Sequence, residues 1–136
     1  MFKKILVPVD LSHPEKAGIM IDAATKMGGK GAKITMISVV ENIPAYVASE
    51  LPRGILAQRE ENAKQELDDI AKASGQKMQT EVRIGNASTS ILDAAEDIAT
   101  DLIIVASHRP GLQDYLLGST AARIVRHAKC SVLVLR

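Results

Sequence analysis

The chain has 136 residues, a length typical of one domain built around a single core. Apolar residues make up 46% and charged residues 24%, the proportions of a globular protein, and the formal net charge is +1. This balance gives no long-range attraction to nucleic acid or to an anionic membrane. The scarcity of aromatic side chains, which single-stranded nucleic acids need for stacking, also argues against nucleic acid. We expect neither partner.

The cysteine content and the apolar segments indicate the compartment. Cys130 is the single cysteine of the sequence, which excludes an intrachain disulfide and a metal site made of paired thiolates. The first apolar stretch ends at Pro8 and is too short for a signal peptide, and no run approaches the roughly 18 apolar residues that span a bilayer. We therefore expect a cytoplasmic protein without a membrane partner.

The first half of the chain is expected to alternate strand and helix. Residues 5–9 are apolar on both faces, as in a parallel strand that helices cover on both sides. Ser12 is a good N-cap for a helix at 14–27, which a group of glycines ends before a strand at 33–40. A loop then precedes a long amphipathic helix at 55–74.

The second half continues the alternation. Residues 78–84 alternate apolar and polar side chains, which is typical of a strand with one face exposed to solvent. A helix marked by Ile91 and Ile98, a strand at 101–106, a loop, a helix at 119–128 and a strand at 131–135 follow. This order predicts an α/β fold: one domain over residues 1–136, with an open, mostly parallel five-stranded sheet and helices on both faces, as in Rossmann-like proteins.

Ligands of such sheets bind outside the carboxyl ends of the strands, where the winding direction reverses. The turn at 118–120, which contains Gly118, Ser119 and Thr120, precedes the last helix, and its backbone N–H groups and hydroxyls suit a phosphate. His108 and Arg109 on the preceding loop add further donors. Serine and threonine are also ordinary N-caps, so this pattern alone leaves the structural interpretation open.

Four segments carry a family resemblance. They are residues 5–12 (ILVPVDLS), 105–110 (VASHRP), 115–121 (YLLGSTA) and 125–134 (VRHAKCSVLV). Together they resemble the universal stress protein family, and in particular its F/G-type members, over the whole chain. The resemblance implies a fold like that of the adenine nucleotide alpha hydrolases.

The resemblance also implies an adenine-nucleotide site, at positions that match the family's motifs. Pro8 and Asp10 would meet the adenine, together with the backbone of Val39. The family's loop, G-x2-G-x9-G-S/T, would hold ribose and phosphates between the tip of the fourth strand and the last helix. The matching positions are Val105, Ala106, His108, Arg109, Gly118, Ser119 and Thr120. Ala106 and Arg109 replace the first two glycines, so Arg109 either contacts phosphate or blocks the site.

We expect a regulatory module of the stress response that binds ATP, ADP or AMP, with or without Mg²⁺, and hydrolyses ATP slowly or not at all. The resemblance implies a homodimer formed through residues 132–135 (Val132, Leu133, Val134 and Leu135), and it leaves open whether dimers pair into tetramers. Two alternatives are an adenylating or ATP-hydrolysing enzyme on a similar fold and a dimeric scaffold that binds no nucleotide. The turn after the first strand lacks the loop motifs of such adenylating enzymes.

Overall fold

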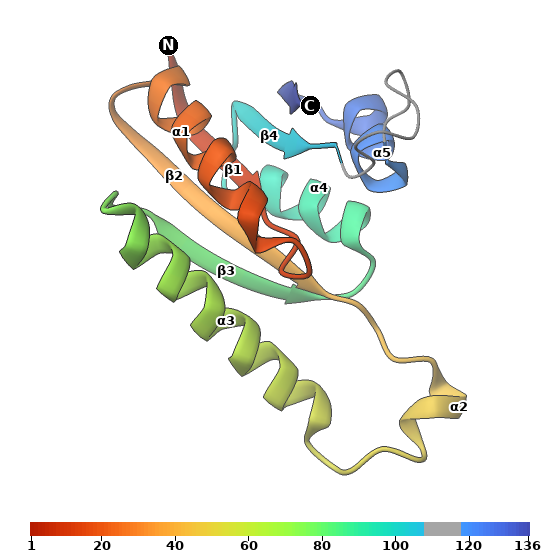
Figure 1. The fold of residues 1–136 in the computed structure, drawn as a ribbon. Coiled ribbons are helices and arrows are strands. Elements are labelled where there is room, and N and C mark those ends of the chain that lie inside the picture. The colour runs from red at the N-terminus through yellow and green to blue at the C-terminus, as the bar shows by residue number, and fades with distance from the viewer. Residues whose placement is uncertain (108–117) are drawn as a thin grey trace.

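The computed structural model describes residues 1–107 and 118–136 as a single α/β layer structure (Figure 1). Its strands form one parallel five-stranded sheet in the order β3-β2-β1-β4-β5. The strands are β1 (Phe2–Pro8), β2 (Gly28–Val40), β3 (Gln79–Ile84), β4 (Leu102–Ala106) and β5 (Ser131–Leu135). The helices are η1 (Pro14–Lys16), α1 (Ala17–Met27), α2 (Ala45–Ala48), α3 (Ile55–Ser74), α4 (Ala87–Asp97) and α5 (Ser119–His127). The expected α/β class is confirmed.

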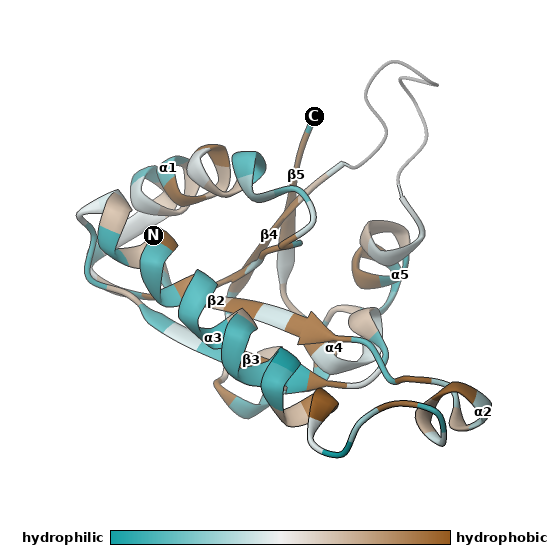
Figure 2. Ribbon diagram, turned by 60° about the horizontal axis from the view of Figure 1, so that its bottom comes forward, coloured by the Kyte–Doolittle hydropathy of each residue, from teal (hydrophilic) through white to brown (hydrophobic). Residues whose placement is uncertain are grey.

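Helices cover both faces of the sheet, because successive strand residues point to opposite sides. Ile5 and Val7 of β1 pack with α1 and α3, whereas Leu6 packs with α4 and α5. Figure 2 shows the hydrophobic strands between the helices and the hydrophilic outer surface of α3. The central strands β1 and β4 are therefore apolar on both faces, which is the pattern that residues 5–9 predict.

The strand order creates a reversal point beside β1. The chain winds from β1 to β2 and β3 in one direction, and then returns to place β4 on the other side of β1. The register pairs Ile5 with Leu102 and Leu6 with Ile103. Connections that leave β1 and β4 in opposite directions open a crevice at their carboxyl ends, where ligands of such folds bind.

Two expectations near the first helix need correction. The structure begins β2 at Gly28, five residues before the expected start at residue 33, because Phe2 pairs with Gly28. The register then shifts before Lys4 pairs with Lys33, so the intervening residues bulge out, with Gly31 at φ +79°. Ser12 is not the N-cap: His13 occupies that position, and the Ser12 hydroxyl bonds to Asp10 instead.

The connection between β2 and α3 contains α2, which the sequence analysis did not anticipate. Figures 1 and 2 show α2 on an arm that projects away from the sheet. Tyr46 on this arm is 79% exposed. Farther along the chain, α4 starts earlier than its apolar positions indicated, because the Asn86 side chain caps it by accepting a hydrogen bond from Thr89 N at 3.1 Å. Within residues 1–107 and 118–136, no helix combines the length and apolarity that a membrane span requires.

Candidate functional site

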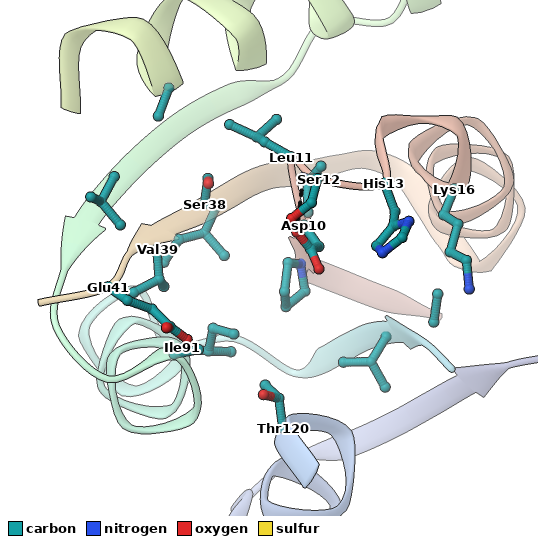
Figure 3. A pocket seen from close by; sticks show the side chains of 18 of the residues that line it. Asp10, Leu11, Ser12, His13, Lys16, Ser38, Val39, Glu41, Ile91 and Thr120 are labelled. Atoms are coloured by element: carbon teal, nitrogen blue, oxygen red, sulfur yellow. Dashed lines mark hydrogen bonds between the residues drawn. The ribbon is translucent and has the colours of Figure 1, made fainter. Parts of the chain in front are cut away.

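A pocket of about 620 Å³ lies at the carboxyl ends of β1, β2 and β4, as the reversal point predicts (Figure 3). This volume is in the range of small-molecule binding sites. The turn after β1, the first turn of α5, the start of α4 and one side of α3 complete its walls. The pocket therefore joins segments that are far apart in the chain, from Pro8 to Ile124.

Six of the ten expected site residues line this pocket. They are Pro8, Asp10, Val39, Val105, Ala106 and Thr120. Gly118 and Ser119 stand at the start of α5 beside Thr120, but they are not among the lining residues. His108 and Arg109 lie outside the described residues. The question of whether Arg109 contacts or blocks a phosphate therefore stays a prediction.

Asp10 fixes the turn that leaves β1. Its carboxylate oxygen Oδ1 accepts hydrogen bonds from Ser12 N at 2.9 Å and from Ser12 Oγ at 2.6 Å. Its carbonyl oxygen accepts a hydrogen bond from His13 N at 2.9 Å. Asparagine and aspartate favour such turns because their short side chains reach the backbone two residues on. The turn holds Asp10 at the pocket wall, so a capping role and a ligand role are compatible.

One end of the pocket is mostly apolar. Pro8, Val39 and Ile91 line it. Val39 and Ile91 belong to the hydrophobic cluster between the sheet and the helices α4 and α5. Figure 3 shows the Glu41 side chain extending toward Ile91 at this end. The Val9 N–H donates to the Ile37 carbonyl at 2.8 Å, which ties the tips of β1 and β2 together. This end is an apolar surface with one carboxylate, that of Glu41, beside it.

The wall of the pocket at the start of α5 offers hydrogen-bond donors. Gly118 is the N-cap of α5, and the first turn of this helix carries no acidic residue. The first backbone N–H groups of a helix have no internal partners and carry the positive end of its dipole. Thr120 places a hydroxyl in the pocket beside them. An anionic group is favoured beside the start of α5.

Lys16 also lines the pocket, and the sequence analysis missed it. Its ammonium nitrogen Nζ donates a hydrogen bond to the carbonyl oxygen of Ser107, directly after β4. Ser107 N in turn donates to the Leu135 carbonyl at 2.8 Å. The contact between Lys16 and Ser107 therefore joins the start of the first helical segment to the end of β4 across the pocket wall.

Ser38, Glu41 and Arg59 are further lining residues that sequence reasoning missed. The period of two along the second strand, continued past its end, would have placed Glu41 on the face of Val39. Arg59 resembles every other charged residue of a solvated helix, so the sequence held no signal for it. Ser38 is 5% exposed and lies on the opposite face of β2, toward α3.

The described part of the chain places neither a metal-binding cluster nor a cysteine in the pocket. Within residues 1–107 and 118–136, no group of three histidine, cysteine or acidic side chains is arranged to hold a metal ion. Cys130 lies between α5 and β5, away from the pocket at the reversal point. Burial raises the pKa of the Cys130 thiol above its ordinary value, which is typical of a structural cysteine.

Comparison with known proteins assigns the family. The sequence profile of the universal stress protein family matches residues 1–136. The chain belongs to the universal stress protein family. The resemblance drawn from the strand tips and the C-terminal segments is thereby confirmed.

Individual relatives agree with this assignment. Universal stress protein A homolog 2 of Coxiella burnetii is 33% identical, over 99% of this chain and 95% of its own length. Universal stress protein G of Escherichia coli O157:H7 is 26% identical over the full length of both chains. The solved structure of the protein MJ0577 superposes with a TM-score of 0.78 and 26% identity, covering 99% of this chain and 96% of that one.

Two more distant structures of this family contain nucleotides. A universal stress protein in complex with cAMP has a TM-score of 0.65 and 21% identity, over 99% of this chain and 97% of its own. The universal stress protein from Archaeoglobus fulgidus in complex with dAMP has a TM-score of 0.69 and 13% identity, over 98% of both chains. At these identities the similarity shows a shared fold.

Proposed function

We propose that this universal stress protein binds an adenine nucleotide in the pocket at the ends of β1, β2 and β4, and acts as a homodimeric regulatory module of the stress response. The observation that carries the proposal is that one pocket combines apolar surface at Val39 and Ile91 with hydrogen-bond donors at the start of α5. A nucleotide has a base and phosphates that match these two surfaces. ATP is the proposed ligand, with ADP and AMP as closely related alternatives.

The apolar end suits the base. Pro8 and Ile91 offer flat and branched apolar surface, and the backbone of Val39 at the tip of β2 offers hydrogen-bonding groups beside it. Asp10 stands next to Pro8, held by Ser12, where its carboxylate can accept a hydrogen bond from the base or the ribose. Small-molecule sites combine an apolar lining with a few fixed polar groups in this way.

The start of α5 suits the phosphates. Its first-turn N–H groups, with Gly118 as N-cap and Thr120 in the pocket wall, form the kind of anion site that helix N-termini provide. The structures that hold cAMP and dAMP support a nucleotide in this fold, since both ligands carry adenine and phosphate. Mg²⁺ is proposed only as an ion that accompanies the phosphates.

Slow or absent hydrolysis follows from the acids that reach the pocket. Among the described lining residues, Asp10 and Glu41 are the carboxylates, and Glu41 lies at the apolar end. Efficient phosphoryl transfer needs metal ions held near the phosphates and a positioned base or water. The described residues provide neither arrangement at the start of α5, so binding with little turnover is the proposed outcome.

The homodimer is proposed to form through β5, the edge strand next to β4. Its residues 132–135 are half-buried and apolar, and among the described residues no further strand pairs with it, so this apolar edge is prone to pair with another chain. A twofold partner that pairs through the same strand would protect it.

The proposed compartment is the cytoplasm, where a nucleotide ligand is available.

The binding test uses the purified full chain, native mass spectrometry and isothermal titration with ATP and with adenosine. We expect the wild-type protein to bind both ligands. Ala87 lines the pocket at the start of α4, whereas Ala122 is exposed on α5 and does not line it. Ala87→Phe should abolish binding by filling the space, and Ala122→Phe should bind as the wild type does. Wild-type protein that carries no nucleotide and shows no binding at millimolar ATP would contradict the proposal.

A further inference from the structure

The charged side chains of the pocket are distributed unevenly. Lys16 and Arg59 are its lysine and arginine among the described lining residues. Arg59 is exposed on α3, next to the arm that carries α2, whereas Lys16 is half-buried on the side of β4. Figure 3 shows Lys16 and Glu41 at opposite ends of the pocket. The pocket therefore has an acidic rim at its apolar end and a cation at the end of β4.

The position of the Lys16 ammonium is fixed by two features. Lys16 ends the short helix η1, where its N–H donates to the His13 carbonyl at 3.2 Å, and Nζ donates to the Ser107 carbonyl. An ammonium group carries three N–H donors, so the bond to Ser107 occupies one of them. Because these bonds already order the Lys16 side chain, it loses less conformational entropy on binding a ligand than a freely rotating lysine would lose.

Among residues 1–107 and 118–136, no carboxylate forms an ion pair with this ammonium. The ion pairs of the described residues join other partners, and Lys16 takes part in none of them. A carbonyl oxygen carries only a partial charge, so the positive charge of Lys16 is available to an anion in the pocket. The first turn of α5, with Thr120, borders the same pocket from the other side of β4.

We propose that Lys16 binds the phosphates of the nucleotide and makes affinity increase with the number of phosphates. The proposal rests on the proposed nucleotide site. The ammonium and the α5 amides flank the end of β4, and together they attract the phosphate chain away from Glu41. The base then occupies the apolar end. Lys16 thus determines the preference for ATP over AMP and adenosine, while the apolar end determines the preference for adenine.

The experiment measures the dissociation constants of adenosine, AMP, ADP and ATP for the wild type, Lys16→Met, Lys16→Arg and Lys26→Met. Lys26 is an exposed residue of α1 outside the pocket, so Lys26→Met is the matched control for removing one positive charge. Methionine keeps the length of the side chain and removes the charge. Melting temperatures of all four proteins verify that each variant folds.

We expect Lys16→Met to weaken ATP binding by about tenfold or more, the usual effect of losing a hydrogen bond to a charged group, and to leave adenosine within about twofold. Lys16→Arg should keep most of the ATP affinity, and Lys26→Met should match the wild type. Raising the salt concentration should reduce the ATP preference of the wild type more than that of Lys16→Met.

Three results would overturn the assignment. The first is unchanged ATP affinity in Lys16→Met while adenosine still binds, which would refute the role of Lys16 and leave the nucleotide site intact. The second is an equal loss for adenosine and ATP that Lys16→Arg does not rescue, which would show a structural role for the bond to Ser107. The third is wild-type protein that binds none of the four ligands, which would overturn the proposed function and this inference together.

Discussion

Asp10 and Ser12 form a closed turn in the wall of the pocket: the Asp10 carboxylate accepts hydrogen bonds from both the backbone N–H and the hydroxyl of Ser12, at 2.9 and 2.6 Å. The turn uses one carboxylate oxygen for both bonds. It holds the first residues after β1 in place before any ligand arrives, and preorganisation of this kind lowers the entropic cost of binding.

Asp10→Ala should weaken adenosine and ATP binding alike, each by about tenfold, because the change removes a charged acceptor and loosens the turn. Asp22→Ala, a loss of the same charge on the exposed side of α1, should leave both affinities unchanged. Isothermal titration measures the effect. The equal loss for the two ligands distinguishes Asp10 from Lys16, and unchanged affinities would exclude Asp10 from the site.

Asp101 should make the stability of the fold depend on pH. Its side chain accepts hydrogen bonds from Lys3 N at 2.8 Å and Lys4 N at 3.0 Å, and these bonds, led by the one from Lys3, lower the pKa of Asp101 below its ordinary 3.8. A lowered folded-state pKa stabilises the protein above the unfolded value, and the contribution is lost as the pH falls through the folded value.

We therefore expect Asp101→Ala to lower the free energy of unfolding by about 1 to 2 kcal/mol at pH 7, the cost of two hydrogen bonds to a carboxylate. The difference from the wild type should shrink as the pH falls below about 4. Urea denaturation between pH 7 and pH 2.5 measures it, with the exposed Asp93→Ala as the control. A difference that stays constant over this range would contradict the prediction.

Val134→Pro should separate the proposed dimer into monomers. Leu135 directs its carbonyl toward β4, where it accepts the bond from Ser107 N, and successive strand residues direct their backbone groups to opposite sides. Val134 therefore presents its N–H to the open edge of β5, and proline removes that donor without touching the bonds to β4.

Light scattering coupled to size-exclusion chromatography measures the mass of the wild type, Val134→Pro and Val134→Thr. The threonine variant keeps the N–H and the branched shape, so it should stay dimeric. A wild-type monomer, or a Val134→Pro dimer as stable as that of the wild type, would show that β5 is not the dimer interface.

Cys130 should react slowly with thiol reagents. Burial, assisted by the negative charge of Asp101, raises the pKa of the Cys130 thiol, so its thiolate fraction near pH 8 is lower than that of a free thiol. Iodoacetamide labelling at pH 8, followed by mass spectrometry, should be several-fold slower for the folded protein than for the protein unfolded in urea. Equal rates would show an accessible and reactive cysteine.

The sequence by itself determined the α/β class, the bounds of α3, and the edge of the sheet where the pocket lies. Periodic burial encodes these features locally: strands that are apolar on both faces demand two layers of helices, and residues after such strands collect at one edge. The family resemblance supplied ten expected site residues, and the six of them that line the pocket lie at strand tips or in the first turn of the last helix.

Only the tertiary structure decided that Lys16 contacts Ser107 and that Arg59 and Ser38 line the pocket. It also showed that the Ser12 hydroxyl donates a hydrogen bond to Asp10 and does not cap the helix. It also decided the early start of β2. The pairing of Gly28 with Phe2 extends the strand there, although glycine locally favours a loop. Apart from the local turn of Asp10 and Ser12, each of these features depends on which distant segment lies alongside, and the period of a single element carries no information about that neighbour.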